Sequence, residues 1–425
     1  MTFEPTREFA AARDLADGLG PFRERFNLPP PKDGRDSVYL CGHSLGLQPK
    51  LAVQYVEQEL ADWAQLGVEG HYRARRPWLP YHRLATPGLA SLCGAEEREV
   101  VAMNTLTVNL HLLMTTFYRP DGRRNKVVIE STAFPSDRFA VTSQIRSHGY
   151  DPGEALLEWQ PDADSEELLM ADLERLLGEH AGEIAILLLP GVQYYNGQLL
   201  DMQEICRLGR REGCVVGLDL AHAIGNVPLS LSAWGPDFAT WCSYKYLNGG
   251  PGAVGGAFVH SRHLDADGGG IVLLGWWGHD EATRLRMAPT FTPARGAELW
   301  QLSNPPILSL APVLASLQIF EEAGIDRLRE KSLELTDYLQ YLLEERFSGQ
   351  VGSITPRGAR GCQLSLVVQD AELDARDVFR RLEQQQVTAD WREPNVIRVA
   401  PVPLYNSFGD VCEFTQRLGA ALTRR

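Results

Sequence analysis

Two charged side chains stand where predicted strands end, and residues in such positions can do chemistry. Asp219 closes the apolar stretch CVVGLDL, with His222 three residues further on, and Lys245 follows FATWCSY. An unpaired carboxylate at the end of a buried strand costs free energy, so it needs a partner. Ligands of open α/β sheets bind at the carboxyl ends of the strands. Lys245 alone would be interpreted as a surface charge, but the pair indicates a shared pocket.

A strand-end lysine and a strand-end carboxylate are two groups that pyridoxal phosphate requires. The lysine forms a Schiff base with the cofactor, and the carboxylate keeps the ring nitrogen protonated so that the ring accepts electrons. Lys245 and Asp219 therefore predict a pyridoxal phosphate site, with His222 close enough to join it.

Two predicted strand-to-helix turns offer further groups for such a site. At Asn104–Thr107, free backbone amides of a helix start could bind a phosphate, or the threonine hydroxyls could simply cap the helix. At the next turn, Phe134 could stack on a ring and Asp137 could accept a hydrogen bond. The alternative there is a packed aromatic at a capped helix start. Each turn is a weak signal alone, and their convergence at one sheet edge favours the ligand site.

Three other motifs match known patterns without the context that those patterns need. Ser44 in Gly42–Gly46 matches the nucleophile elbow of serine hydrolases, yet only a helix and a loop are predicted before it. Gly250–Gly255 matches a dinucleotide-binding loop but precedes a strand, which favours a turn between strands. His260 and His263 lack a third ligand at metal spacing, which favours a solvated strand end. A serine esterase that uses Ser44 is the alternative from a different class.

The elements that position these residues alternate between short apolar runs and amphipathic ones. From about residue 97 to 243, strands such as NKVVIES and IAILLLPG are separated by predicted helices, one of which opens at a predicted Asp164 cap. This alternation predicts an α/β fold whose mostly parallel sheet is flanked by helices. After about residue 300 the pattern indicates a small α+β domain. We expect an N-terminal helical segment at 1–35 that packs with the small domain, a large cofactor domain at 36–310 and a small C-terminal domain at 311–425.

Composition argues against several classes of function. The 41 basic and 55 acidic residues give a net charge of −14, which disfavours nucleic acid or an anionic membrane as the main partner. The longest apolar runs fall far short of the ~20 residues of a membrane span, and the first residues interleave charges with alanines. Seven cysteines without C-x-x-C spacing favour a reducing compartment and no zinc site. We therefore expect an acidic cytoplasmic enzyme without a metal.

Taken together in chain order, the motifs resemble those of the kynureninase family. They run from residue 42 to about residue 408 and read GHSLGLQP, NTLTVNLHLL, FPSD, LDLAHAIGN, SYKYLN, GWWGH, LSNPPIL and IRVAPVPLYNSF. The resemblance implies the fold-type I pyridoxal phosphate fold of the aspartate aminotransferase superfamily and a homodimer with active sites at the subunit interface. It also implies hydrolysis of the Cβ–Cγ bond of L-kynurenine, or of 3-hydroxy-L-kynurenine, to L-alanine and anthranilate or 3-hydroxyanthranilate, in tryptophan catabolism and NAD biosynthesis.

The resemblance also assigns roles to residues at matching positions. Catalysis would fall to Lys245, which would hold the cofactor, and to Tyr244 as an acid or base. Contacts with the cofactor are implied for Leu106, Thr107, Phe134, Pro135, Ser136, Asp137, Asp219, His222, Tyr244, Lys245, Trp276 and Asn304. Contacts with the substrate are implied for Arg398, His71, Ser303 and Asn304. Some of these residues would come from the partner subunit, and the planar fork of Arg398 suits a carboxylate.

Two other activities on the same fold remain as alternatives, a class V aminotransferase and a cysteine desulfurase. A desulfurase needs a mobile nucleophilic cysteine, whereas Cys362 in ARGCQLSL is predicted to begin a strand. One departure from relatives is visible, since Pro190 stands where some of them carry a hydroxyl residue.

Overall fold

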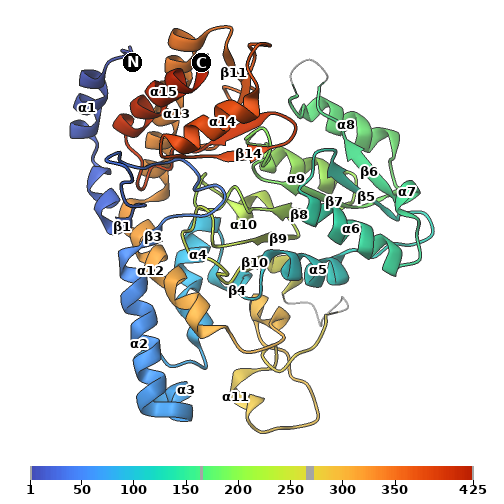
Figure 1. Cartoon of the computed structure of the whole chain (residues 1–425). Coiled ribbons are helices and arrows are strands. Elements are labelled where there is room, and N and C mark those ends of the chain that lie inside the picture. Colours follow the sequence, from blue (N-terminus) through green and yellow to red (C-terminus); the bar gives the residue numbers. More distant parts are fainter. Residues whose placement is uncertain (1, 163–165, 265–271, 424–425) are drawn as a thin grey trace.

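A seven-stranded sheet forms the centre of the computed structural model, which describes residues 2–162, 166–264 and 272–423 (Figure 1). Its strands, in spatial order, are β4 (Val100–Ala102), β10 (Gly256–Val259), β9 (Phe238–Trp241), β8 (Val215–Asp219), β7 (Ile184–Pro190), β5 (Lys126–Glu130) and β6 (Leu156–Trp159). The five strands from β9 to β6 are parallel, and β10 is antiparallel to both of its neighbours. The predicted mostly parallel sheet is therefore confirmed.

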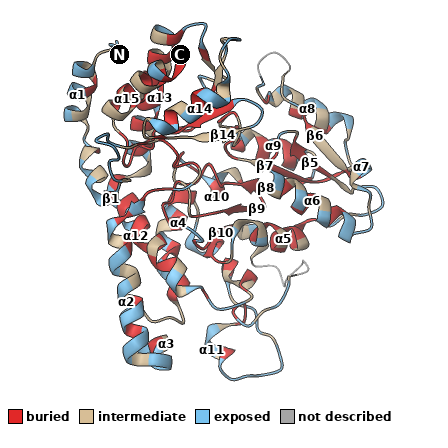
Figure 2. Cartoon of the chain, viewed as in Figure 1, coloured by how far each residue is buried: buried red, intermediate tan, exposed pale blue. Residues whose placement is uncertain are grey.

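Helices cover both faces of this sheet because alternate side chains of each strand point to opposite sides. Val127 and Ile129 of β5 belong to one apolar cluster, whereas Val128 belongs to the other. The first cluster includes residues of α5 (Leu106–Phe117), α6 (Pro135–Ser147) and α7 (Pro152–Ala155). The second includes residues of α4 (Thr86–Cys93), α8 (Met170–Glu179), α9 (Met202–Arg211), α10 (Leu231–Trp234) and α12 (Ile307–Ala323). Figure 2 shows the strands buried between helices whose outer faces are exposed.

A second sheet organises the C-terminal part of the chain. Its four strands lie in the order β11 (Val351–Ser353), β12 (Leu364–Val368), β15 (Val396–Val399) and β14 (Asp390–Arg392), and all their pairings are antiparallel. A separate apolar cluster joins it to α13 (Ile325–Phe347), α14 (Ala375–Gln384) and α15 (Phe408–Leu422). The expected small α+β unit is thus present, and its sheet edge β14 lies on the side facing the large sheet (Figure 1).

The N-terminal residues bridge the two parts of the molecule. α1 (Arg7–Ala16) packs against α15, and the Asp14 carboxylate accepts hydrogen bonds from the first amides of that helix, Phe408 N and Gly409 N, at 2.7 and 2.9 Å. β1 (Phe26–Asn27) pairs with β3 (Gln48–Pro49), and β2 (Val38–Tyr39) pairs with β13 (Val387–Thr388) of the small unit. α2 (Lys50–Leu66) packs along α12 and leads to α3 (Gly70–Arg73).

The division into 1–35, 36–310 and 311–425 stays a prediction. The whole of α12 belongs to an apolar cluster of the large sheet, and the cluster of the small sheet begins within α13. Packing therefore favours a boundary close to Gly324, where α12 ends and the chain turns with a φ of +79°.

One helix begins later in the chain than the sequence pattern predicts. The predicted Asp164 cap lies outside the described residues, and α8 begins only at Met170, after Leu169. Among the described residues no single helix is long and apolar enough to cross a membrane; only α12 and α13 together reach that length and composition, and they bend by 81°. Short helical segments complete the described chain at Gly20–Arg25, Gly67–Glu69, Tyr81–Leu84, Glu97–Glu99, Ser261–His263, α11 (Glu281–Arg284) and Gly296–Trp300.

Candidate active site

A cavity of about 220 Å³ opens at the carboxyl ends of the parallel strands. The ends of three neighbouring strands contribute Glu130, Pro190 and Asp219 to its wall, and Lys245 follows the next strand. Most residues assigned to the cofactor from the sequence share this cavity: Leu106, Thr107, Phe134, Ser136, Asp137, Asp219, His222, Tyr244 and Lys245. Pro135, at the first position of α6, lies between two of its lining residues.

Lys245 is half-buried between two aromatic rings of the cavity wall. Its Nζ atom lies 5.8 Å from the centroid of the Phe134 ring and 5.9 Å from that of Tyr244. The ring of Phe134 is 40% exposed and meets Tyr194 edge to face at 5.2 Å. The amine therefore lies in the cavity with an exposed aromatic face beside it, on which a planar ring can stack.

Three buried carboxyl groups gather in the same wall. Asp219 ends β8 and accepts a hydrogen bond from Ala221 N at 2.6 Å. Asp137, on the first turn of α6, hydrogen-bonds with Asp219, and burial together with the charges on Asp219 and Glu130 raises the pKa of Asp137 well above its ordinary value. Burial, with a further contribution from Asp219, raises the pKa of Glu130 to about 8. The raised pKa values keep Asp137 and Glu130 protonated at neutral pH, so both can donate hydrogen bonds beside Asp219.

Glu130 was missed by the sequence reasoning, although a signal for it was present. It ends the apolar run KVVIE, the position that singled out Asp219 on another strand. Its strand β5 lies next to β7, and β7 next to β8, so parallel pairing places the two carboxyl groups at the same edge.

Two helix starts form the opposite end of the cavity. α5 begins after Thr105, whose side chain caps no amide, and the first helical hydrogen bond is made only by Asn109 N. The hydroxyls of Thr107 and Ser136 lie 2.7 Å apart and join the start of α5 to that of α6. Gly255 packs so close that a Cβ there would lie 3.3 Å from Leu106 N. These free amides and hydroxyls make an anion site of the kind that binds phosphate, so the alternative of capping threonine hydroxyls is not what the structure shows for Thr105.

His222 and Tyr244 complete the inner wall. His222 is buried, and burial together with the charges of Lys245 and Arg398 lowers its pKa well below the ordinary value, so the imidazole is neutral. Its Nδ1 atom is buried without a hydrogen-bond partner. Burial raises the pKa of Tyr244, which keeps the phenol protonated. A neutral imidazole and a protonated phenol can each donate a hydrogen bond.

Arg398 reaches the cavity through Tyr194. Its side chain is 1% exposed, and Nη1 donates to the carbonyl oxygen of Tyr194, a residue of the cavity wall, at 2.6 Å. Nη2 is paired with Asp390, and burial lowers the pKa of Arg398 to about 10, so the guanidinium stays charged at neutral pH. Tyr194 and Asp390 were not predicted, because neither residue belongs to a recognisable motif.

Besides Pro135 and Arg398, four more predicted residues do not line this cavity within the one chain. Ser303 and Asn304 line a separate cavity of about 360 Å³, which shares Thr105 with the first. Trp276 is 50% exposed and donates from Nε1 to the carbonyl oxygen of Arg284 at 3.3 Å. His71 lies on α3, where its ring meets Trp78 at 5.4 Å. Their roles stay predictions.

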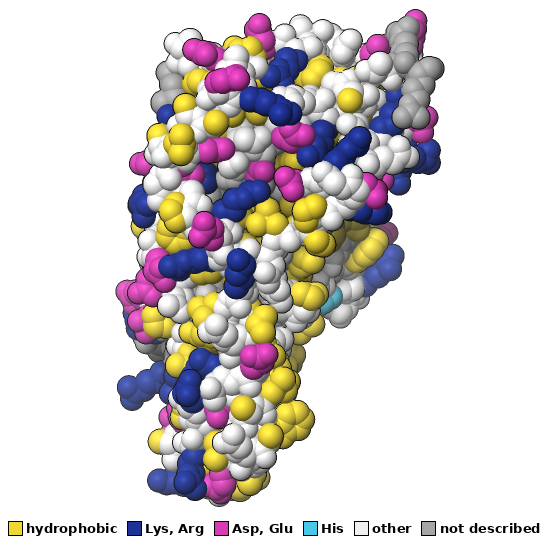
Figure 3. Space-filling model, turned by 60° about the vertical axis from the view of Figure 1, so that its left-hand side comes forward, with side chains coloured by type: hydrophobic (Ala, Val, Ile, Leu, Met, Phe, Trp, Pro, Cys, Tyr) yellow, Lys and Arg dark blue, Asp and Glu magenta, His cyan; other side chains and the backbone are white. Residues whose placement is uncertain are grey.

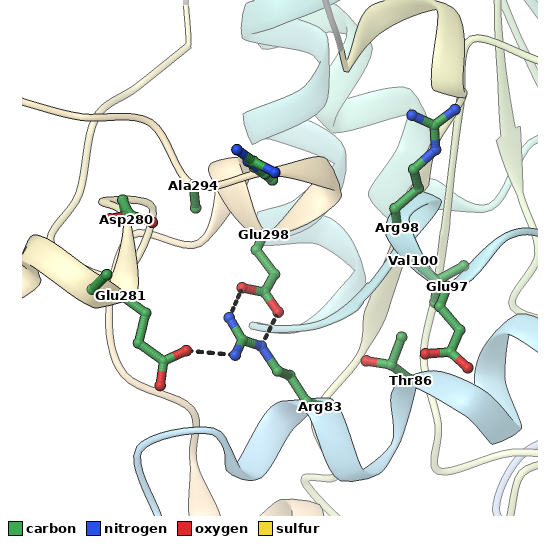
Figure 4. Close-up of a pocket in the computed structure, with 11 residues that line it drawn as sticks. Arg83, Thr86, Glu97, Arg98, Val100, Asp280, Glu281, Ala294 and Glu298 are labelled. Carbon is green, nitrogen blue, oxygen red and sulfur yellow. Dashed lines mark hydrogen bonds and ion pairs between the residues drawn. The ribbon is translucent and has the colours of Figure 1, made fainter.

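The larger charged cavity shown in Figure 4 contains an ion-pair network centred on Arg83. Glu298 accepts two hydrogen bonds from Arg83, at 2.6 and 2.7 Å, and Arg83 also contacts Glu281. His82 adds a contact of 3.1 Å to Glu298. Although this cavity measures about 720 Å³, Arg83, Glu281 and Glu298 in its wall contact one another, as in a structural ion-pair network.

The three isolated motifs have structural roles. Ser44 follows β2 in a turn that leads to β3, and neither strand belongs to the large sheet, so the strand-to-helix elbow of a hydrolase is not formed. Gly250–Gly255 lies between β9 and β10, as predicted for a turn between strands. His263 contacts Asp237 at 2.7 Å, and among the described residues no group of three ligating side chains could hold a metal.

The residues present fit pyridoxal phosphate. A protonated ring nitrogen would pair with Asp219, beside the neutral Asp137 and Glu130, and the buried Asp137 Oδ1 has no hydrogen-bond partner. The α5 amides and the Thr107 and Ser136 hydroxyls suit the phosphate, and Lys245 supplies the amine.

Solved structures of other proteins share this fold. The cystine C–S lyase C-DES, in complex with cysteine persulfide, matches with a TM-score of 0.76 at 17% identity over 90% of this chain and 97% of its own. A related C-DES structure carries glycine covalently linked to its PLP cofactor. A cysteine desulfurase from Thermococcus onnurineus matches with a TM-score of 0.74 at 18% identity over 89% of this chain and 93% of its own. The fold and the site together define a fold-type I pyridoxal phosphate-dependent enzyme.

Sequence relatives narrow this class to one family. Kynureninases of Koribacter versatilis and Myxococcus xanthus are 51% and 50% identical, over 99% and 98% of this chain and 99% and 97% of their own length. Residues 328–418 match the kynureninase C-terminal domain. The chain belongs to the kynureninase family.

The cysteine side chains do not support the alternative of a cysteine desulfurase. All seven cysteines are buried and unpaired, and Cys362 is fully buried just before β12, where its amide donates to Asn226 Oδ1 at 3.0 Å. A thiol held in that way cannot act as a mobile nucleophile.

Proposed function

We propose that this enzyme hydrolyses the Cβ–Cγ bond of L-kynurenine to give anthranilate and L-alanine, a hydrolase reaction on a carbon–carbon bond next to a ketone. The observation that carries this proposal is the Lys245 cavity with a carboxylate-binding arginine behind its Tyr194 wall. The sequence identity of 51% over nearly the whole chain supports the same activity. 3-Hydroxy-L-kynurenine is the second candidate substrate, and the reaction belongs to tryptophan catabolism.

One set of residues of this chain would bind the cofactor, and Arg398 would bind the substrate. When bound, pyridoxal phosphate supplies the electron sink that stabilises negative charge at the substrate α-carbon. The α5 amides, Thr107 and Ser136 would hold its phosphate, and Phe134 would pack on its ring. Asp219 would accept a hydrogen bond from the ring nitrogen and so keep that nitrogen protonated. Arg398 binds the substrate carboxylate, which orients the α-carbon toward Lys245.

Lys245 and Tyr244 move the protons. The Lys245 amine, once free of the cofactor, takes the proton from the substrate α-carbon as a general base and returns a proton later in the reaction. Tyr244 keeps its phenol protonated, because burial raises its pKa, and so it serves as the donor when negative charge develops on a nearby oxygen. A water molecule adds to the ketone carbon and is the hydrolytic reagent.

We also propose that two copies of the chain form a homodimer whose sites lie at the interface. Large apolar side chains are exposed along α2 and α3: Val53, Leu60, Trp63, Val68 and Tyr72, at 41%, 43%, 61%, 74% and 57%. Figure 3 shows hydrophobic side chains on the lower part of the molecule, where these helices lie. Exposed apolar surface of this extent is typical of a subunit interface. His71, Trp276, Ser303 and Asn304 lie outside the Lys245 cavity, so they are the residues that a partner would contribute.

Seven free thiols suit a reducing compartment, and we place the enzyme in the cytoplasm. The test of the activity is an assay of purified holoenzyme with L-kynurenine and, separately, with 3-hydroxy-L-kynurenine. We expect anthranilate or 3-hydroxyanthranilate to form together with an equal amount of L-alanine. Formation of neither aromatic product contradicts the proposed function, whereas pyruvate or a pyridoxamine form of the enzyme would indicate a lyase or an aminotransferase instead.

A further inference from the structure

Asp390 occupies the binding surface of Arg398 that a substrate carboxylate needs. The two residues are directly opposite each other in the antiparallel pair of β14 and β15, and the Asp390 Oδ2 atom contacts Arg398 Nη2. Arg398 Nη1 is used by the carbonyl oxygen of Tyr194, and Nε is buried without a partner. A carboxylate that binds this guanidinium with both oxygens therefore has to share or replace the contact of Asp390.

A second guanidinium, that of Arg392, also contacts Asp390. Arg392 lies two residues along β14, on the same face of the strand, and its Nη2 atom is 3.1 Å from the same oxygen of Asp390. Arg392 is 35% exposed at its side chain, and its guanidinium lies 6.0 Å from the Tyr194 ring, against 5.8 Å for Arg398. Both arginines therefore lie near Tyr194, a residue of the cavity wall.

The titratable groups around Asp390, other than the two arginines, are neutral. His43, from the Gly42–Gly46 motif, lies with its Nε2 atom 3.6 Å from Asp390 Oδ2, but it is fully buried, and burial with the charges of Arg398, Lys245 and Arg392 lowers its pKa well below the ordinary value. Cys41 is also neutral, because burial raises its pKa. Two guanidinium groups therefore face the one carboxylate of Asp390.

We propose that Asp390 is a resident counter-ion of Arg398 that is exchanged for the substrate carboxylate, with Arg392 holding Asp390 in the exchanged state. In the free enzyme Asp390 neutralises and orients a buried guanidinium that would otherwise be costly. When the substrate carboxylate arrives, Asp390 keeps its contact with Arg392 and the new carboxylate takes Arg398. Asp390 and Arg392 thereby set the affinity for the carboxylate of the substrate and of the product. The inference rests on the proposed function for the role of Arg398.

The exchange predicts opposite effects for two conservative substitutions. Asp390→Asn keeps the shape and one acceptor oxygen but removes the competing charge, so the Kd of L-alanine should fall by about tenfold. Arg392→Gln removes the second partner of Asp390 and leaves it on Arg398, so the Kd should rise by about the same factor. L-Alaninamide, which lacks the carboxylate, is the matched control ligand, and its Kd should change little in either variant.

The experiment is calorimetric titration of the wild-type, Asp390→Asn and Arg392→Gln holoenzymes with L-alanine and L-alaninamide, with unfolding temperatures measured for each. Opposite shifts for L-alanine alone support the exchange. Weakened or unchanged binding of L-alanine in both variants overturns it, as does an equal shift for the two ligands. Arg392→Gln keeps the test valid if Asp390→Asn does not fold, because a Kd that does not rise in that variant also contradicts the exchange. Anthranilate formation by the wild-type enzyme is measured separately, so failure of the proposed function remains distinguishable.

Discussion

Asp137 and Asp219 bring two carboxyl groups into hydrogen-bonding contact in the wall of the Lys245 cavity, one from a helix start and one from a strand end. Such a pair does not ionise fully, and the raised pKa belongs to Asp137. Asp137 is therefore the protonated hydrogen-bond donor of this pair, and Asp219 is the acceptor.

This division of charge predicts unequal effects of the two isosteric amide substitutions. Asp219→Asn removes the charge that keeps the ring nitrogen protonated and should lower kcat by roughly 10²- to 10⁴-fold. Asp137→Asn replaces a neutral acid by a neutral amide and should lower kcat by less than about tenfold. Steady-state assays of both variants at saturating cofactor check this, and equal losses would contradict the assignment of the charge.

Lys245 and Tyr244 are adjacent in the chain but should respond differently. Lys245→Ala removes the amine that holds the cofactor, so the visible absorption of the lysine-linked cofactor should be lost and activity should fall by at least ~10³-fold. Tyr244→Phe removes only a donor, so the absorption should remain while kcat falls by roughly 10- to 100-fold. Absorption spectra and kcat of the two purified variants test this, and a lysine-linked chromophore that persists in Lys245→Ala would exclude that residue.

Glu130 predicts a pH dependence of the stability of the apoenzyme. Its pKa is about 8 in the fold, above the ordinary 4.5, so the folded state binds the proton more tightly than the unfolded chain. The stabilisation is complete below about pH 4.5 and is lost as the pH rises through 8, by at most about 1.4 kcal/mol per pH unit. As the pH rises from 5.5 to 8.5, the free energy of unfolding should therefore fall less for Glu130→Gln than for the wild type.

Urea unfolding of both apoenzymes at several pH values in that range measures the difference directly. Because Asp137 also titrates with a raised pKa, only the difference between the two proteins reports on Glu130. Parallel curves of the free energy of unfolding against pH would show that Glu130 is not protonated in the fold.

A buried ion pair fastens the N-terminal residues to α13. Lys331 Nζ lies 2.7 Å from Asp17 Oδ2, and the two side chains are 6% and 9% exposed. Lys331→Met leaves the Asp17 carboxylate buried and unpaired, which should lower the free energy of unfolding by about 3–5 kcal/mol. The double variant Asp17→Asn with Lys331→Met should recover a large part of this loss, as measured by urea unfolding, and no recovery would mean that the charge of Asp17 is not the cause.

The exposed face of α2 tests the proposed dimer. Trp63→Glu places a charge in that face, and it should convert the dimer to a monomer with a large loss of activity. Leu15→Glu on α1 is the matched control, since Leu15 is 90% exposed and lies outside α2 and α3. Size-exclusion chromatography with light scattering measures the mass, and a wild-type monomer with full activity would contradict the proposal.

The cofactor end of the site follows from local sequence pattern. Asp219 and Lys245 stand after apolar runs whose length and composition indicate strands, and parallel pairing brings strand ends to one edge whatever the details of packing. The same reasoning applied to KVVIE would have included Glu130. The start of α8 was harder to predict from the sequence, because the polar residues before Met170 continue a helical pattern. The helix itself begins after Leu169.

The sequence by itself determined the parallel sheet, the strand-end positions of Asp219 and Lys245 and, through its motifs, the family, since all three depend on periodicity and on short runs of residues. Only the tertiary structure decided which charges meet. Asp390 faces Arg398 because of the register of β14 on β15, and Tyr194 joins that pair to the cavity because the small unit docks against the large sheet. Tyr194 and Arg398 are 204 positions apart in the chain, and no local pattern records the strand register and the docking that bring them into contact.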